Sequence, residues 1–235
     1  MDRKVLDKVF DKPTLFNIHT LFNKGIFREF GGPIADGKEA RVFTAFNDLT
    51  LAVKVYRVDA SNFETLYQYI KGDPRFWHVG KARRNLINVW VKKEFSNLKR
   101  LYAAGVSVPK PLAFKGNVLV MDFIGNEIPA PQLRDVKLTN PKKTFKDIIS
   151  DVKIGFEKGK LVHADLSEYN ILMQGGHHVI IDVGQGVDIR HPKSIEFLKR
   201  DVKNMCTFFS KYFKTDEKKT MDFILENHID EKKGD

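Results

Sequence analysis

The chain has 235 residues, of which 42% are hydrophobic and 30% charged, a composition typical of a soluble globular protein with one large domain or two small lobes. No apolar run approaches the roughly 20 residues of a membrane-spanning helix, and the single cysteine, Cys206, excludes an intrachain disulfide. We therefore expect a cytoplasmic protein with no membrane partner. The net charge of +10 favours polyanionic ligands such as a nucleotide, RNA or an acidic surface, although no RNA-binding signature accompanies it.

Residues 1–30 predict a helical extension. Apolar residues recur at helical spacing on both sides of Pro13, and Lys24-Gly25 is a typical helix end. We expect a pair of short helices packed on the first sheet.

A glycine turn follows at residues 31–40, before an alternating strand pattern at 41–46. Gly32 to Lys38 has the spacing of a P-loop, but Glu39 replaces the required Ser or Thr, and no helix pattern follows. The turn is either an ordinary hairpin or one that lies over a triphosphate and offers backbone N–H groups. We assign Gly37, Lys38 and Glu39 to nucleotide binding.

Residues 49–56, LTLAVKVY, predict a strand with Lys54 in its middle. A lysine at this place is either an edge-strand residue that prevents aggregation or one with a buried partner. A helix with an apolar stripe follows, and Glu94 occupies that stripe, so its carboxylate needs a cation. We therefore predict an ion pair between Lys54 and Glu94. The connection between them, residues 57–84, is long and is expected to be mobile.

Residues 118–124 predict a further strand, which continues into Gly125 and a proline-bearing connector between two lobes. The backbone of such a connector can hydrogen-bond the edge of a purine. We assign Met121, Asp122 and Ile124 to this role. Amphipathic helices are predicted over about 145–156, 195–213 and 217–229.

The segment from Leu161 to Gly184 carries the densest polar pattern. A loop, residues 163–170, precedes two apolar runs joined by a Gly-Gly turn, which predict a hairpin that ends near Asp182. The hairpin would bring Asp182 to Asp165 and Asn170. Asn170 and Asp182 suit Mg²⁺ or Mn²⁺ held partly by phosphate oxygens, which leaves Asp165 to accept a proton. The alternative is a surface loop without chemistry.

Two further predictions concern histidines of this segment. His163 is expected to orient the loop rather than to catalyse. His177 and His178 are expected to be exposed in the hairpin turn.

Together these motifs resemble those of protein kinases, and most specifically the RIO family of atypical serine/threonine protein kinases. The resemblance is to the first branch, which lacks a winged helix, in a short archaeal-type form. The resemblance implies an α+β, two-lobed fold: an N-lobe of antiparallel sheet plus helix over 31–122 and a helical C-lobe over 123–235. Few residues follow Asp182, so we expect no activation loop and no peptide-binding subdomain. The matching segments are Gly37–Ala40, Ala52–Tyr56, Lys93-Glu94, Val120–Gly125, His163–Asn170 and Ile181–Gln185.

The resemblance also implies a function. ATP with Mg²⁺ or Mn²⁺ would be the cofactor, Lys54 would hold the phosphates, Asp165 would be the catalytic base, and Asn170 with Asp182 would bind metal. Family members autophosphorylate on serine, act as ATPases through an aspartyl-phosphate, here at Asp182, and mature the small ribosomal subunit. The implied partner is the pre-ribosomal small subunit, its proteins and rRNA, with no DNA.

Two alternatives stay open at the level of sequence. A small-molecule kinase of the aminoglycoside or choline type has a similar motif layout, but it normally carries a larger helical domain after the metal-binding Asp. An ATP-binding assembly scaffold with little turnover would need no complete set of catalytic residues, and this chain has one.

Overall fold

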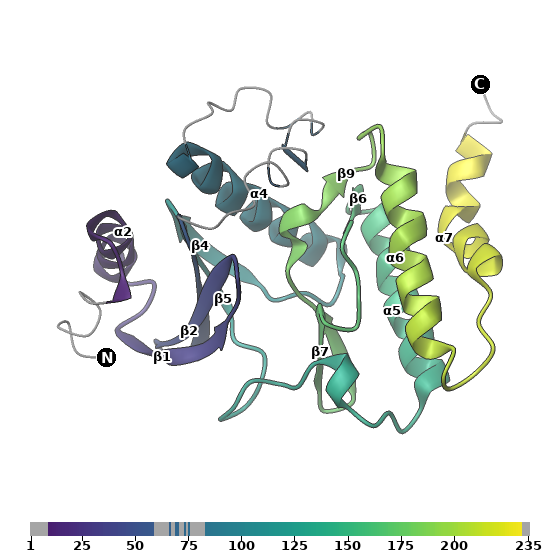
Figure 1. Ribbon diagram of the computed structural model, residues 1–235, viewed down its shortest axis with the longest axis horizontal. Coiled ribbons are helices and arrows are strands. Elements are labelled where there is room, and N and C mark those ends of the chain that lie inside the picture. Colours follow the sequence, from purple (N-terminus) through teal and green to yellow (C-terminus); the bar gives the residue numbers. More distant parts are fainter. Residues whose placement is uncertain are drawn as a thin grey trace.

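The computed structural model describes residues 9–58, 66, 69–70, 73, 75 and 83–231. Figure 1 shows a sheet-bearing part that contains the N-terminal elements and a helical part that contains the C-terminal ones. The sheet-bearing part consists of α2 (Lys12–Asn23), β1 (Glu29–Asp36), β2 (Ala40–Phe46), β3 (Thr50–Tyr56), α4 (Arg83–Ala104), β4 (Pro111–Lys115) and β5 (Val118–Asp122).

The sheet is antiparallel, with the strand order β1-β2-β3-β5-β4. β3 lies at its centre, and Lys54 is paired with Val42 on one side and Leu119 on the other. Successive side chains of a strand point to opposite faces. Val53 and Val55 therefore join the apolar cluster that includes Ile18 and Leu21 of α2, while Lys54 faces the other side.

The N-terminal helix differs from its prediction. α2 begins at Lys12, so Pro13 lies in its first turn rather than between two helices. A proline fits there because the first turn of a helix leaves its N–H groups without intrahelical partners. The Asp11 side chain caps this end and accepts the N–H of Thr14 at 3.0 Å. The other predicted helix falls mostly on residues 1–8, outside the described residues.

The helical part contains α5, α6 and α7, with short two-stranded sheets and 3₁₀ turns between them. Residues 183–193 connect Asp182 to α6, and within them lie η2 and β9. The bounds are η1 (Leu133–Asp135), α5 (Pro141–Glu157), β6 (Leu161–Val162), β7 (Ile171–Gln174), β8 (His177–Ile180), η2 (Val183–Gln185), β9 (Val187–Asp188), α6 (Ser194–Phe209) and α7 (Glu217–Glu231).

One large apolar cluster joins the two parts. It includes Leu98 of α4, Leu119 of β5, Phe156 of α5 and Phe209 of α6. α4 therefore belongs to both parts, and in Figure 1 it lies between the sheet and the segment around β6 and β9. None of the described helices combines the length and apolar character that crossing a membrane requires.

Candidate active site

Lys54 lies at the centre of the site. Its side chain is 10% exposed, and its Nζ is 2.9 Å from Glu94 Oε1 and 2.8 Å from Asp182 Oδ1. The structure thus contains the ion pair expected between β3 and α4, and it adds the carboxylate that follows the β7–β8 hairpin. Three residues that are distant in sequence meet at one ammonium group.

The charges of this triad depend on one another. Burial disfavours the charged form of Lys54, but the carboxylates of Asp182 and Glu94 outweigh it and raise the pKa of the ammonium. Burial raises the pKa of Glu94 to about 7, against the opposing effect of Lys54. The nearby Lys54 ammonium lowers the pKa of Asp182. Asp182, whose side chain is 53% exposed, therefore presents an ionised carboxylate to the open side of the site.

The loop of residues 163–170 is held by His163. Its Nε2 lies 3.0 Å from the carbonyl of Ile181, and its Nδ1 accepts the backbone N–H of Asp165 at 3.3 Å. This pattern requires the proton on Nε2. Burial lowers the pKa of His163, which favours the neutral ring. His163 thus ties the loop to the end of the hairpin, in agreement with the orienting role expected from the sequence.

Asp165 lies beside this loop with its carboxylate hydrogen-bonded. Gln185 donates to Asp165 Oδ2 at 2.9 Å, and Asn170 donates to the Asp165 carbonyl at 2.8 Å and more distantly to Oδ2 at 3.4 Å. Burial and then the charge of Asp182 raise the pKa of Asp165. A carboxylate with a raised pKa suits proton acceptance from a hydroxyl group.

Asp201 on α6 was not predicted as a site residue, yet it binds the backbone of the loop. Its Oδ2 accepts the N–H of Ala164 at 2.8 Å and its Oδ1 the N–H of Leu166 at 2.9 Å. Ala164 has a positive φ of 64°, a strained conformation for a residue with a side chain. Asp201 is buried beside the apolar Leu198 and Val202. A carboxylate that interrupts an apolar helix face requires a buried partner, so the sequence marks Asp201 as such a residue but not the groups that it binds.

A second missed group lies on α4. Lys93 is fully buried, and its Nζ donates to the carbonyl oxygens of Gly184, at 2.7 Å, and Gly186. Asn97, one turn later and also fully buried, donates to the carbonyls of Val183 at 2.8 Å and Gly186 at 2.9 Å. Lys93 and Asn97, here called the α4 clamp, thus fix the backbone that follows Asp182.

The residue at position 184 must be small for α4 to approach the backbone so closely. A Cβ added to Gly184 would lie 3.0 Å from the indole ring of Trp90, also on α4. Asp182 itself has a left-handed backbone, with φ 61° and ψ 52°. Such a conformation is sparsely populated by non-glycine residues and persists where its surroundings fix it. The α4 clamp supplies those surroundings.

The oxygen atoms of Asp182 and Asn170 suit a hard cation that takes its remaining ligands from water and phosphate. Asn170 uses its amide nitrogen toward Asp165, which leaves its oxygen as an acceptor. Within the described part of the chain, no group of three or more His, Cys, Asp or Glu side chains is placed to hold a metal. One carboxylate and one carboxamide suit Mg²⁺, which binds few protein ligands and completes its shell with water and phosphate oxygens.

The predicted phosphate-binding turn joins β1 and β2. The N–H of Gly37 donates to the carbonyl of Ala40 at 2.9 Å, and Gly37 and Lys38 are exposed. A strand, not a helix, follows, which agrees with the rejection of a P-loop. Burial and then the charge of Asp182 raise the pKa of Glu39, so this turn lies within the electrostatic field of the Asp182 carboxylate.

The predicted purine-binding connector follows β5. Met121, Asp122 and Ile124 are all half-buried. The Asp122 N–H donates to Lys110 and the Ile124 carbonyl accepts from Ala130, each at 2.9 Å. Neither of these two bonds uses the Asp122 carbonyl or the Ile124 N–H, the type of backbone group that can bind a base.

One prediction was wrong and one lies largely outside the structure. His177 is exposed, but His178 is buried and its Nε2 is 2.9 Å from Asp151 Oδ2. The β7–β8 register turns His178 toward α5, so strand alternation, not turn position, decides its exposure. Most of the predicted mobile connection, residues 57–84, falls outside the described residues.

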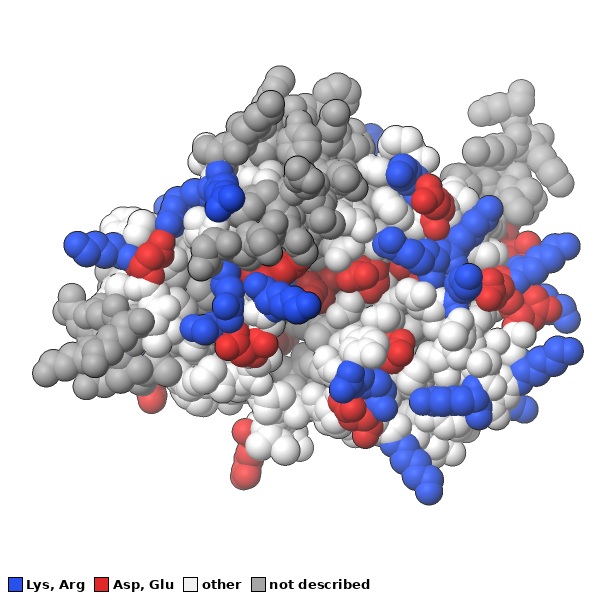
Figure 2. All heavy atoms as spheres, in the orientation of Figure 1, with Lys and Arg blue, Asp and Glu red and all other residues white. Residues whose placement is uncertain are grey.

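The surface agrees with this geometry. Figure 2 shows acidic side chains gathered in a hollow at the middle of the visible face, with basic side chains around it. Carboxylates in the hollow would repel a bare triphosphate, so nucleotide binding here requires cations. Lys54 and a metal ion would supply them.

Comparison with known proteins gives consistent matches. The model of the RIO domain matches residues 41–223. The chain is 43% identical over 209 residues to the RIO-type serine/threonine-protein kinase Rio1 of Haloferax volcanii, covering 88% of this chain and 72% of the relative. It is 44% identical over 210 residues to the protein of the same name from Methanocaldococcus jannaschii, with the same coverage.

A more distant relative and a solved structure extend these matches. Human serine/threonine-protein kinase RIO1 is 36% identical over 219 residues, which cover 90% of this chain and 38% of the human protein. The crystal structure of the Rio2 kinase-ADP/Mg²⁺-phosphoaspartate complex from Chaetomium thermophilum superposes with a TM-score of 0.71 at 24% identity, covering 92% of this chain and 70% of that one. The likeness confirms the predicted α+β, kinase-like fold.

Proposed function

Because the chain belongs to the RIO domain family and is an atypical serine/threonine protein kinase, we propose that it transfers the γ-phosphoryl group of ATP to serine, including serine of its own chain. The observation that carries this proposal is the meeting of Lys54 with Glu94 and Asp182 at one ammonium group, 2.9 and 2.8 Å away. A buried lysine held by a glutamate is the arrangement that kinases use for the phosphates of ATP.

Each group then has a task in the transfer. Lys54 would bind the α- and β-phosphates while Glu94 holds it in place. Asp165 would accept the proton of the attacking serine hydroxyl, while the serine oxygen bonds to the γ-phosphorus and ADP leaves. Asn170 and Asp182 would hold Mg²⁺, which supplies positive charge to the phosphate oxygens. Glu39 and the turn at Gly37 and Lys38 would cover the phosphates, with Met121, Asp122 and Ile124 beside the base.

The same site supports a second outcome, ATP hydrolysis through Asp182. Its ionised, half-exposed carboxylate would attack the γ-phosphorus, release ADP and form an aspartyl-phosphate, which water would then cleave to free phosphate. A phosphoaspartate complex of the Rio2 kinase, which shares this fold, motivates the proposal. Family membership further favours a cytoplasmic role in maturation of the small ribosomal subunit, with the pre-ribosomal particle as partner.

The fate of the γ-phosphate distinguishes these reactions. Incubation with γ-labelled ATP and Mg²⁺ should place label on serine of the protein, release free phosphate, or both. Asp165→Asn should reduce label on serine by about 10²–10⁴-fold, the contribution of a general base. ATP binding should persist. Asp222→Asn, which changes an exposed carboxylate on α7, is the matched control.

Three results would contradict parts of this proposal. Near-normal labelling by Asp165→Asn would remove it as the base. Label transferred only to an added small molecule would favour the aminoglycoside or choline type of kinase. ATP bound without release of its γ-phosphate would indicate the scaffold. Co-sedimentation with small ribosomal subunits, with and without ATP, tests the proposed partner.

A further inference from the structure

A groove lies away from the active site, between α2 and α4. It consists of a cavity of about 650 Å³ and a second of about 480 Å³, and Arg84 lines both. Neither is lined by Lys54, Asp165 or Asp182. We call these two cavities together the α2–α4 groove. The groove serves no step of phosphoryl transfer, so its chemistry requires a separate explanation.

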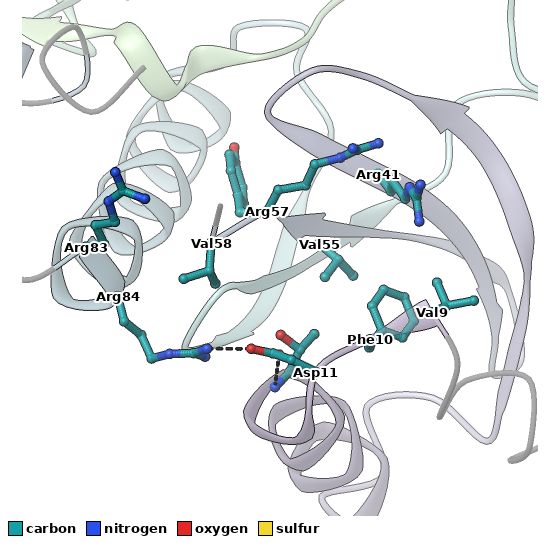
Figure 3. Close-up of a pocket in the computed structure, with 11 residues that line it drawn as sticks. Val9, Phe10, Asp11, Arg41, Val55, Arg57, Val58, Arg83 and Arg84 are labelled. Carbon is teal, nitrogen blue, oxygen red and sulfur yellow. Dashed lines mark hydrogen bonds and ion pairs between the residues drawn. The ribbon is translucent and has the colours of Figure 1, made fainter. Parts of the chain in front are cut away.

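The walls of the groove are strongly basic. Arg83 and Arg84 of α4 line the first cavity, and Figure 3 shows Arg84 reaching toward Asp11, with Arg41 and Arg57 on the strand side. Lys92 and Lys115 line the second cavity with Arg84. Asp36 accepts hydrogen bonds from Arg41 and Arg57, and Asp11 pairs with Arg84. Without Arg83, the groove carries five cations, Arg41, Arg57, Arg84, Lys92 and Lys115, against these two carboxylates, which leaves an excess of positive charge for an anionic ligand.

Two local features point to an anion. The first turn of α4 carries Arg83 and Arg84 and no acidic residue, so cations lie at the positive end of a 22-residue helix. The positive end of a helix favours anions, so a phosphate there would add to the negative charge that Asp11 already supplies to Arg84. In addition, the buried Nε of Arg57 is a donor without a hydrogen-bond acceptor among the described residues. The Arg57 side chain lines the first cavity, and a guanidinium N–H donor fits a phosphate oxygen.

The shape and the aromatic residues narrow the class of anion. Arg84, Asn88 and Lys92 follow one another at i, i+4 on one face of α4, a stripe about 12 Å long at 1.5 Å per residue. Phe16, 67% exposed on α2, and Phe114 on β4 line the same cavity. Basic grooves that contain exposed aromatic rings bind single-stranded nucleic acids, because unpaired bases stack on the rings while cations follow the backbone.

We propose that the α2–α4 groove binds a single-stranded nucleic acid, with phosphates on its arginine and lysine side chains and an unpaired base on Phe16. A phosphorylated peptide would use the cations but would gain little from that ring. The proposal does not rest on phosphoryl transfer, because none of Lys54, Asp165 and Asp182 lines the groove.

The test measures binding of an eight-nucleotide uridine RNA to the full chain by fluorescence anisotropy at several salt concentrations. Lys92→Gln with Lys115→Gln should weaken binding about tenfold. Loss of two phosphate contacts should reduce the slope of log affinity against log salt by about 1.4, at about 0.7 per contact with a single strand. Phe16→Ala should weaken binding about tenfold, the effect of one stacked base, without changing that slope.

The matched control is Lys199→Gln with Lys203→Gln, two exposed lysines of α6 that carry the same charge change. Equal weakening by both lysine pairs would overturn the proposal, since binding would then follow overall charge alone. An unchanged affinity of Phe16→Ala, or equal competition by a phosphoserine octapeptide, would overturn it in favour of general anion binding. Labelling from γ-labelled ATP should remain near wild type in all these variants, so failure of the kinase proposal would be seen separately.

Discussion

Lys93 and Glu94 are neighbours on α4, both almost fully buried, yet they meet opposite kinds of partner. Glu94 meets a cation, Lys54, which in turn meets Asp182. Lys93 donates to the uncharged carbonyl oxygens of Gly184 and Gly186. One helix therefore holds Lys54 and the segment after Asp182 in two ways, by charge on one side and by hydrogen bonds to the backbone on the other.

The charged side of α4 and the side of the α4 clamp differ in their access to ligands. The charged side opens to solvent at Asp182, so a phosphate or a metal ion can compete for Lys54 and Asp182. The side of the α4 clamp is closed, and no ligand reaches Lys93 or Asn97. We infer that the charged side binds and responds, whereas the clamp fixes the conformation in which Asp182 is presented.

Lys54→Met should give the largest effect on turnover, because it removes the positive charge that would face the phosphates of ATP. Turnover of γ-labelled ATP should fall about 10²–10³-fold, the scale for loss of one electrostatic contact in a transition state. The fold should persist, since Glu94, whose pKa is about 7, can take up a proton once its cation is removed. Lys158→Met, at an exposed position, is the control. Unchanged turnover would place the phosphates elsewhere.

Lys93→Met should act on geometry instead of charge. The carbonyls of Gly184 and Gly186 would lose a donor, which should lower the free energy of unfolding by about 1–3 kcal/mol. The Mg²⁺ concentration for half-maximal labelling should rise, because Asp182 would be held less firmly. The adjacent, exposed Lys92→Met should change neither quantity. A destabilised variant with an unaltered Mg²⁺ requirement would show that the clamp serves stability alone.

The stability contributed by Lys93 should depend on pH. Burial lowers its pKa to about 7 from an ordinary 10.5, with the carboxylate of Asp73 opposing this. Between these values the unfolded chain binds the proton that the folded chain lacks, so stability rises with pH by at most about 1.4 kcal/mol per unit. This contribution is lost as pH falls to 7. Chemical denaturation should therefore show Lys93→Met to be more destabilising at pH 9 than at pH 7, and equal values would contradict the shift.

Gln185→Leu should produce the smallest effect and connect the two sides. Gln185 lies between the glycines that Lys93 holds, and it donates to Asp165 Oδ2 at 2.9 Å. A donor to a carboxylate stabilises its charged form, so its loss should raise the pKa of Asp165 further. The acid limb of the pH profile for kcat/KM should move to higher pH. A shift of the acid limb to lower pH, or no shift, would show that Gln185 does not influence the pKa of Asp165.

The charged side of α4 could be predicted from sequence and the clamp could not. Glu94 interrupts an apolar stripe, and Lys54 interrupts a β-branched strand, so each demands a partner of opposite charge. Lys93, Asn97 and Asp201 bond to backbone groups instead. Nothing in a sequence marks which carbonyl or N–H group secondary structure will leave without a partner. Their roles appear only when the backbone of residues 164–186 is in place.

His178 shows the same limit for exposure. The Gly-Gly turn was identified correctly, but the strand register, which pairs His178 with Met173, decides which histidine turns inward. A register shift of one residue would exchange the environments of His177 and His178. Register depends here on packing against α5 and on Asp151, which lie outside the hairpin.

The hydrogen bonds between Asp201 and the loop have a consequence for folding during protein synthesis. A nascent polypeptide that has emerged only as far as residue 193 already contains Lys54, Glu94, Asp165, Asn170 and Asp182. It still lacks the carboxylate that receives the N–H groups of Ala164 and Leu166. We therefore infer that the loop reaches its final conformation late in translation, once α6 has left the exit tunnel and docked.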